Sequence, residues 1–245
     1  MTLVALLAVL LVFVFGIQQK QNRLVSKINV NISAIENGKP IIKADDIFAI
    51  VESQAGFDIE RASLKDFDII NLEEALNSDK RIEFANVYFG KNGNMFIDII
   101  QRQPIVRVTS NDGNDYYLDK YGKKIPVKEV SVLRLPVATG AIDTYVNDYE
   151  SQLANNLNQI YTIAVEIDKD PFLNSLIEQI NVEEDGTFVM VPKLGRNKII
   201  LGNETALVEK LNKLKTYYKE GIKRVGLDTY SGINLSYEGH IVGIK

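Results

Sequence analysis

The sequence contains no cysteine and a single histidine, His240, among its 245 residues. Thiolate chemistry, disulfide bonds and cysteine-based metal sites are therefore excluded, and one imidazole supplies too few ligands for a zinc site. A lone histidine near the end of the chain is also a poor candidate for a catalytic triad. Neither glycine-rich phosphate-binding pattern, G-x-x-x-x-G-K-[ST] or G-x-G-x-x-G, occurs. The sequence therefore predicts no catalytic residue, no metal ligand and no cofactor, and the absence of cysteine fits a compartment in which thiols are oxidised.

The charge balance also lacks a basic excess. The formal net charge is −4 at pH 7, which argues against a nucleic-acid-binding surface. Acidic residues cluster at Asp45-Asp46 and at residues 183–185, but both clusters have structural explanations. Negative charge is favourable at the start of a helix, which explains the first. The second cluster precedes Gly186 between two expected strands, which is typical of a hairpin turn.

The first seventeen residues, MTLVALLAVLLVFVFGI, are almost entirely apolar, and only Thr2 and Gly16 interrupt them. This length lies at the lower limit for crossing a hydrocarbon core. The segment fits a cleaved signal peptide or a retained anchor; the missing basic n-region and the missing small-x-small cleavage site favour the anchor. We expect a transmembrane anchor over residues 1–19, with Leu3 to Ile17 in contact with membrane lipid, and a juxtamembrane segment over residues 20–27.

The basic residues beside this segment conflict with an extracytoplasmic domain. Lys20, Arg23 and Lys27 follow the apolar run, and only the α-amino group precedes it. A strict positive-inside count places the following domain in the cytoplasm. A basic tail preceding a misplaced start codon would resolve the conflict.

Residues 28–103 are predicted to form a compact β-α-α-β-β domain. Residues 25–35 alternate apolar and polar side chains, which is typical of a strand with one buried face. Asp45 or Asp46 is expected to cap a helix that ends at Gln54, and Asn71 is expected to cap a second helix over residues 72–77. Strands are predicted over residues 82–89 and 95–101, joined by a hairpin loop rich in glycine and asparagine.

Residues 104–245 are predicted to form a mixed β domain with two long helices, which makes the whole chain α+β. Strands are expected over residues 105–109, 116–118, 177–182, 187–191, 198–201, 233–237 and 240–244, with another ending at Ile125. One helix is expected from Asp148 to Ala164 on its apolar spacing, which includes Tyr149 and Leu153. The other is expected to be capped by Asn203 and to end at Gly221. Asp119 and Gly122 are expected to form a turn in which Asp119 accepts backbone N–H bonds.

Six segments occur in an order that matches a known family: residues 82–88 (IEFANVY), 95–108 (MFIDIIQRQPIVRV), 117–122 (YLDKYG), 135–140 (LPVATG), 201–202 (LG) and 233–237 (INLSY). Together they resemble the motifs of the bacterial cell-division family FtsQ/DivIB, in a form similar to its Bacteroidota members. Two positions depart from the family pattern, since Ser236 stands where many members have arginine and Asn234 replaces an aspartate. The resemblance implies that residues 28–103 form a POTRA domain.

The resemblance further implies a non-enzymatic divisome scaffold at the division septum. The expected location is the cell inner membrane, with a single-pass anchor and the large C-terminal domain in the periplasm. Its partners would be single-pass coiled-coil proteins of the FtsB/FtsL type, which add a strand to an open sheet edge and link septum assembly to septal peptidoglycan synthesis. The POTRA domain would offer other divisome proteins a second surface. The expected partner-binding residues are Lys210 and Tyr217 on the last helix, and Ser236, Tyr237, Glu238, Gly239, His240 and Val242 near the end of the chain.

Three other interpretations compete with this one. A different POTRA-bearing component of membrane assembly or secretion usually carries tandem POTRA units or a barrel, for which this chain is too short. An anchored cell-wall enzyme would need a catalytic constellation that the sequence lacks. An anchored ligand-binding domain would require a deep apolar pocket with converging polar groups.

Overall fold

The structure, a computed structural model, describes residues 24–36, 38–56, 59, 62–109, 113, 115–127, 133–152, 155–195 and 197–245. The chain divides into two compact units, with the boundary between Arg102 and Gln103. The predicted anchor over residues 1–19 lies outside the described residues, as do residues 20–23 of the juxtamembrane segment. No helix in the described part of the chain is both long enough and apolar enough to cross a membrane.

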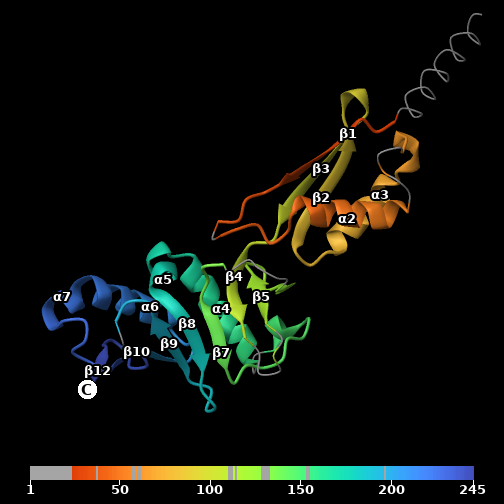
Figure 1. The fold of residues 1–245 in the computed structure, drawn as a ribbon. Helices are drawn as coiled ribbons and strands as arrows, with labels where there is room; N and C mark the ends of the chain where they lie inside the picture. Colours follow the sequence, from red (N-terminus) through yellow and green to blue (C-terminus); the bar gives the residue numbers. More distant parts are fainter. Residues whose placement is uncertain are drawn as a thin grey trace, which may run out of the picture. The chain divides into compact units, whose positions relative to one another are not determined.

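The N-terminal unit is a three-stranded sheet with two helices on one face (Figure 1). The strands lie in the order β1-β3-β2; β1 runs parallel to β3 and β2 runs antiparallel to it. The order of the main elements is the predicted β-α-α-β-β, with two short 3-10 turns between them: β1 (Lys27–Ile32), α2 (Ala44–Ala55), η2 (Leu64–Asp66), α3 (Ile69–Ser78), β2 (Ile82–Phe89), η3 (Lys91–Gly93) and β3 (Asn94–Gln101).

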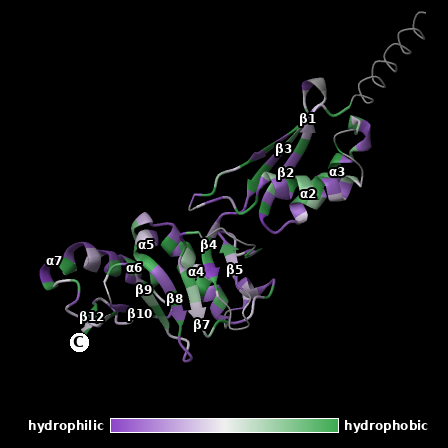
Figure 2. Ribbon diagram, in the orientation of Figure 1, coloured by the Kyte–Doolittle hydropathy of each residue, from purple (hydrophilic) through white to green (hydrophobic). Residues whose placement is uncertain are grey.

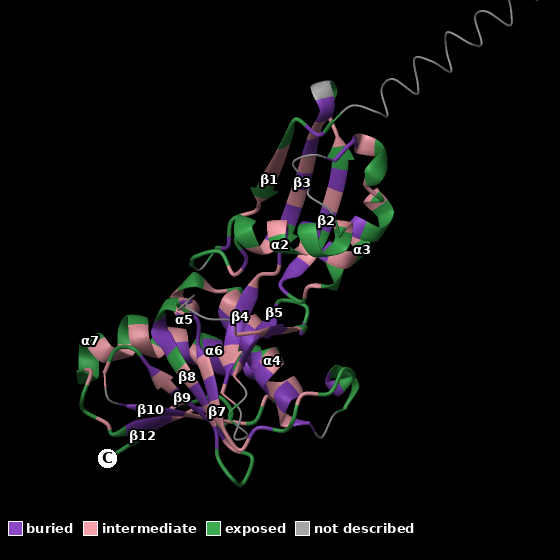
Figure 3. Cartoon of the chain, turned by 45° about the vertical axis from the view of Figure 1, so that its right-hand side comes forward, coloured by how far each residue is buried: buried purple, intermediate pink, exposed green. Residues whose placement is uncertain are grey.

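Alternating side chains on β2 and β3 build the core of this unit. Ala85 and Val87 of β2 and Ile97 and Ile99 of β3 are buried against the apolar faces of α2 and α3. The intervening residues face the other side, so β3 shows alternating buried and half-buried positions (Figure 3). In β2 the alternation begins at Ala85, because the register with β3 shifts between Ile82 and Phe84.

Both helices of the N-terminal unit begin earlier than predicted. Helix α2 begins at Ala44, and its cap is Lys43, whose backbone N–H donates to Asp46 Oδ2 at 2.9 Å. Helix α3 begins at Ile69, because Asp68 Oδ1 accepts the Asn71 N–H at 3.2 Å. Asp46 and Asn71 therefore lie in the first helical turn rather than at the cap position.

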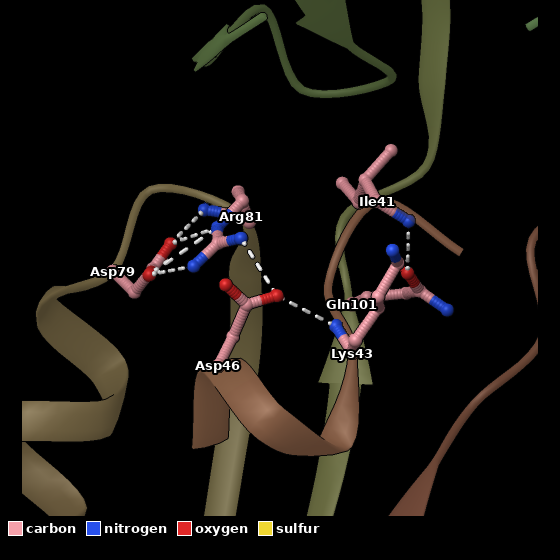
Figure 4. Close-up of polar contacts among 6 residues, drawn as sticks. All are labelled: Ile41, Lys43, Asp46, Asp79, Arg81 and Gln101. Atoms are coloured by element: carbon pink, nitrogen blue, oxygen red, sulfur yellow. Dashed lines mark hydrogen bonds and ion pairs between the residues drawn. The ribbon is translucent and has the colours of Figure 1, made fainter. Parts of the chain in front are cut away.

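A buried polar cluster ties the start of α2 to β2 (Figure 4). Arg81 is 4% exposed. Its guanidinium forms a bidentate ion pair with Asp79, with Nη2 2.7 Å from Oδ2 and Nε 3.0 Å from Oδ1. Its Nη1 also lies 3.1 Å from Asp46 Oδ2. Nearby, the buried Gln101 accepts the Ile41 N–H through Oε1 at 3.0 Å. These polar groups hold the segment before α2 against the end of the sheet.

The C-terminal unit is a nine-stranded sheet in the order β12-β11-β10-β9-β8-β7-β4-β5-β6, with α4, α5 and α6 packed against it. Hydrophobic residues concentrate on its strands, whereas the β8–β9 turn is hydrophilic (Figure 2). The strands are β4 (Pro104–Val108), β5 (Tyr116–Asp119), β6 (Lys124–Pro126), β7 (Val137–Gly140), β8 (Ile177–Val182), β9 (Phe188–Pro192), β10 (Lys198–Gly202), β11 (Gly232–Asn234) and β12 (Val242–Ile244). The helical elements are η4 (Tyr149–Ser151), α4 (Asn156–Asp168), α5 (Pro171–Leu176), α6 (Leu207–Thr216), the π-helical turn η5 (Tyr217–Gly221) and α7 (Ile222–Val225).

The long helices of this unit differ from the prediction at their ends. The predicted helix from Asp148 is a 3-10 turn first, and α4 begins at Asn156 after Asn155, whose Oδ1 accepts the Leu157 N–H; Leu153 lies outside the described residues. Helix α6 begins after Ala206, which has a left-handed φ of 53°. At the other end, Gly221 does not stop the helical path, which continues through η5 and α7 to Gly226.

Both predicted turns are confirmed. Asp119 is fully buried, and its Oδ1 accepts the N–H groups of Tyr121 and Lys123 at 2.9 and 2.7 Å. Gly122 has a φ of 73°, which favours glycine. In the β8–β9 turn, Gly186 has a φ of 82° and its N–H donates to Glu183 O at 3.0 Å.

Tyr149, the first residue of η4, binds the turn formed by Asp119 and Gly122. Its side chain is fully buried, and its hydroxyl donates to Gly122 O at 3.0 Å. Burial raises the pKa of Tyr149 far above its ordinary value, so the hydroxyl keeps its proton.

We expect Tyr149→Phe to lower the free energy of unfolding by about 1 kcal/mol, since one neutral hydrogen bond is lost and the ring is retained. Urea unfolding followed by circular dichroism would measure the change; an unchanged midpoint would contradict it.

Candidate partner-binding edge of the C-terminal sheet

Strand β12 forms one end of the nine-stranded sheet. It pairs antiparallel with β11, with Asn234 opposite Val242, Ile233 opposite Gly243, and Gly232 opposite Ile244. No other strand in the described part of the chain pairs with β12. Its outer side therefore presents backbone groups to a further strand. The opposite end of the sheet is β6, where Pro126 has no N–H to donate.

The terminal hairpin is shorter than predicted. Strand β11 ends at Asn234, whose Oδ1 accepts the Ser236 N–H at 2.8 Å, while the Leu235 N–H still donates to Ile200 O of β10 at 2.8 Å. Strand β12 begins at Val242 rather than at residue 240. Of the eight predicted contact residues, Val242 alone lies on the edge strand. Ser236, Tyr237, Glu238, Gly239 and His240 form the connecting loop, and all five are exposed.

Tyr237 and His240 form the most prominent feature of this loop. Their rings stack with centroids 5.8 Å apart and an interplanar angle of 15°. Tyr237 is 51% exposed, which is high for a large aromatic side chain. Gly239 between them has a φ of 74° and open space around it. The pair thus presents a preformed aromatic surface next to the edge of β12, of the kind that protein interfaces favour.

Helix α6 holds this loop through Lys213, a residue that the sequence analysis does not single out. Lys213 Nζ donates to Tyr237 O at 3.0 Å and lies 3.5 Å from Glu209 Oε1, one helical turn away. Lys213 is half-buried, but a basic residue outside the leucine stripe of a helix carries no signal in the sequence that distinguishes it from a solvated charge. Its role follows only from the way the hairpin packs beside α6.

A groove of about 890 Å³ lies between the helical path from α6 through α7 and the loop that connects β11 to β12. Tyr217, one of the predicted contact residues, lines it. The Tyr217 hydroxyl is buried, and burial raises its pKa, while the neighbouring Asn197 side chain acts in the opposite direction. The groove is lined by Val208, Glu209, Asn212, Lys213, Thr216, Tyr217, Glu220, Gly221, Arg224, Gly239, His240 and Ile241. Its lining mixes apolar side chains such as Val208 and Ile241 with charged side chains such as Glu209 and Arg224.

Lys210 differs from the other predicted contact residues because it points into the fold. It is 6% exposed, and its Nζ donates to Asn203 O at 2.9 Å and to Asn203 Oδ1 at 3.2 Å. Burial lowers the pKa of Lys210. The side chain fixes the loop before α6 and does not reach the groove, whose lining excludes it.

Two glycines allow the hairpin to pack closely. A β-carbon on Gly202, which has a φ of 79°, would lie 2.9 Å from Ser236 Oγ. A β-carbon on Gly243 would lie 2.5 Å from Cδ1 of the Tyr230 ring. Gly243 is opposite Ile233, which is fully buried on the helical side of the sheet. The Tyr230 ring therefore fills the space that a side chain at residue 243 would occupy.

The sequence of this unit matches a known family. Residues 103–243 match the family model described as FtsQ/DivIB, C-terminal related, which covers more than half of the chain. The chain belongs to this family. No curated protein matches the sequence. Membership of this family indicates a role in cell division. Proteins of the family are generally non-enzymatic division scaffolds. The match begins at Gln103, the first residue of the C-terminal unit, and includes the loop and most of β12.

In the part of the chain that the structure describes, no group of three histidine, aspartate or glutamate side chains is arranged to hold a metal ion. His240 stacks on Tyr237 in the exposed loop and lines the groove beside α6. The open edge, the aromatic pair and the groove lie together at this end of the sheet.

Proposed function

We propose that this chain is a membrane-anchored division scaffold that binds FtsB/FtsL-type proteins by strand addition at β12. The observation that carries the proposal is the unblocked edge of β12, which adjoins both the Tyr237–His240 pair and the groove. An added strand gains affinity from backbone hydrogen bonds, and neighbouring side chains supply specificity. The contact residues are Ser236, Tyr237, Glu238, Gly239, His240, Val242, Lys213 and Tyr217.

In this proposal the apolar run from Leu3 to Ile17 anchors the chain in the inner membrane, and the C-terminal unit lies in the periplasm at the division septum. The N-terminal unit is a POTRA domain between the two. The family membership supports the division role, and the order β-α-α-β-β supports the POTRA assignment. The scaffold would link septum assembly to septal peptidoglycan synthesis by holding its partner in place, without catalysing a reaction.

Tyr237→Lys tests the site. We expect the affinity of the fragment containing residues 20–245 for the periplasmic segments of FtsB and FtsL from the same organism to fall at least about tenfold, or about 1.4 kcal/mol. The substitution removes an exposed aromatic anchor and leaves the buried core intact. Isothermal titration calorimetry with both segments present would measure the change.

Tyr121→Lys is the matched control, because Tyr121 is 50% exposed and lies in the turn between β5 and β6. It should bind like the unmodified fragment. Equal affinities for the Tyr237 variant and the unmodified fragment would refute the assignment of the site. A folded fragment that binds neither segment would refute the proposed partner class.

A further inference from the structure

The outer edge of β2, at one end of the small sheet, is closed by side chains of α3. Asn77 Oδ1 accepts the Ala85 N–H at 2.9 Å, and Asn77 Nδ2 donates to Ala85 O at 3.5 Å. Two residues further along, Glu73 Oε1 accepts the Val87 N–H at 2.7 Å. These side chains take the hydrogen bonds that an added strand would make. Covering or capping an edge in this way prevents unwanted pairing.

Strand β1, at the other end of the same sheet, has none of these protections. It contains six residues without proline or a bulge, and its register with β3 continues without a shift from Lys27 to Ile32. No second strand in the described part of the chain pairs with it. An unpaired edge of this length without a register shift is a template for another strand.

The apolar side chains of β1 are also incompletely covered. Ile28, Val30 and Ile32 pack against the core of the N-terminal unit but stay half-buried, whereas Ile97 and Ile99 on β3 are almost fully buried. Figure 3 shows the difference between β1 and the buried positions of β3. A further strand beside β1 would complete the burial of this row.

The sequence of β1 is complementary to itself when two copies run antiparallel. With Val30 on the two-fold axis, Val30 faces Val30, Ile28 faces Ile32 and Asn29 faces Asn31 of the second copy, because directly opposed residues share a face. Lys27 then faces Ser33 rather than another lysine. The diagonal neighbour of Lys27 is Asn31, whose Nδ2 donates to Asp98 Oδ1 at 2.7 Å in its own unit. The lone cation of each strand thus approaches a carboxylate of the other copy.

We propose that β1 pairs antiparallel with β1 of a second copy of this chain, joining two small sheets into one of six strands. The contact is isologous, so two copies close it. It buries the open apolar row and leaves β12 free, so a dimer would present two edges to division partners. This pairing does not depend on the function proposed for β12. Six paired residues make a small interface, so the dimer is expected to be concentration-dependent.

The absence of cysteine allows a clean test with the full chain in a mild detergent. Asn29→Cys and Asn31→Cys are prepared separately, and each is oxidised alone and as an equal mixture. The Ser33 N–H donates to Ile99 O at 2.9 Å, which places the backbone groups of the odd residues toward β3. Residues 29 and 31 of the two copies then form a non-hydrogen-bonded pair with Cα atoms about 4.5 Å apart, within the range of a disulfide. Each variant alone places its sulfur atoms on a diagonal about 7–8 Å long between Cα atoms.

We expect the mixture to give a disulfide-linked dimer and each single variant to give several-fold less. Asn86→Cys, on the same face of the closed strand β2, should give none. If the mixture stays monomeric while both cysteines react with a maleimide, the proposal is wrong. A dimer that forms equally with Asn86→Cys, or one detected by mass but not cross-linked at residues 29 and 31, would overturn it as well, since copies would then meet elsewhere.

Discussion

Replacement of Gly243 by valine is expected to abolish binding of the division partner at β12. The valine β-carbon would lie 2.5 Å from Cδ1 and 2.8 Å from Cγ of the Tyr230 ring, well inside van der Waals contact. Cγ is close to the backbone of residue 230, so the whole ring must move. Either β12 leaves the sheet or Tyr230 leaves its position, and both outcomes change the edge that the partner strand would meet. We expect the affinity to fall by at least about a hundredfold, or about 2.7 kcal/mol.

The same calorimetric titration with the FtsB and FtsL segments measures this loss. Gly186→Asn in the β8–β9 turn serves as a control, because residue 186 has open space around it and asparagine tolerates its left-handed backbone. Circular dichroism should show both variants folded, since β12 contains only three residues at the end of the sheet. Unchanged affinity of the valine variant would mean that the partner does not use this edge.

The strands were predictable where one face of a sheet is buried. Residues 82–89 and 177–182 are predicted at their observed bounds, although a register shift near the start of each strand interrupts the period of two, which then holds from Ala85 and from Ile180. The length of strand β11 was overestimated, since its apolar alternation continues to Tyr237 while its pairing with β12 ends at Asn234, whose side chain accepts the Ser236 N–H. Local side chain to backbone bonds of this kind compete with the ladder without disturbing the apolar pattern.

Helix ends were harder to predict than helix positions, because several polar residues near each start compete for the cap. Asp68 rather than Asn71 is the N-cap of α3, and Asn155 rather than Asp148 is the N-cap of α4. Helix α5 has a signal that the sequence analysis overlooks: Asp170 caps it, and Pro171 occupies its first turn. Tertiary packing selects the cap among such candidates. For example, Tyr149 donates to Gly122 O, and α4 begins only after it.

The strand at the end of the sheet was predictable from the sequence, but its surroundings were not. The terminal hairpin indicates an edge strand, and the exposed loop residues follow from it. Lys210 could have been placed correctly, since it lies on the same helical stripe as Leu207, Leu211 and Leu214, which are buried. Lys213, the groove and the contact of Tyr230 with Gly243 depend on how the hairpin packs against distant segments. No periodicity in the sequence reports such contacts.

Arg81→Met is expected to destabilise the N-terminal unit by about 3 kcal/mol. The guanidinium is buried, donates to both carboxylate oxygens of Asp79 and lies 3.1 Å from Asp46 Oδ2. Breaking a buried pair from one side costs more than the pair contributes, because the Asp79 carboxylate, with its side chain 16% exposed, stays in a poorly solvated place. Lys169→Met is the control: Lys169 pairs with Glu166 at the surface, where an ion pair contributes less than about 1 kcal/mol.

Hydrogen exchange read by mass spectrometry on the full chain separates the two units. In Arg81→Met, exchange should accelerate across α2, β2 and β3, where Asp46 and Arg81 join the start of a helix to the sheet. The C-terminal unit should exchange as before, because it has its own core from Ile105 to Leu235. Uniform acceleration along the chain would show that the two units unfold together, and an unchanged N-terminal unit would show that the Arg81 cluster contributes little to its stability.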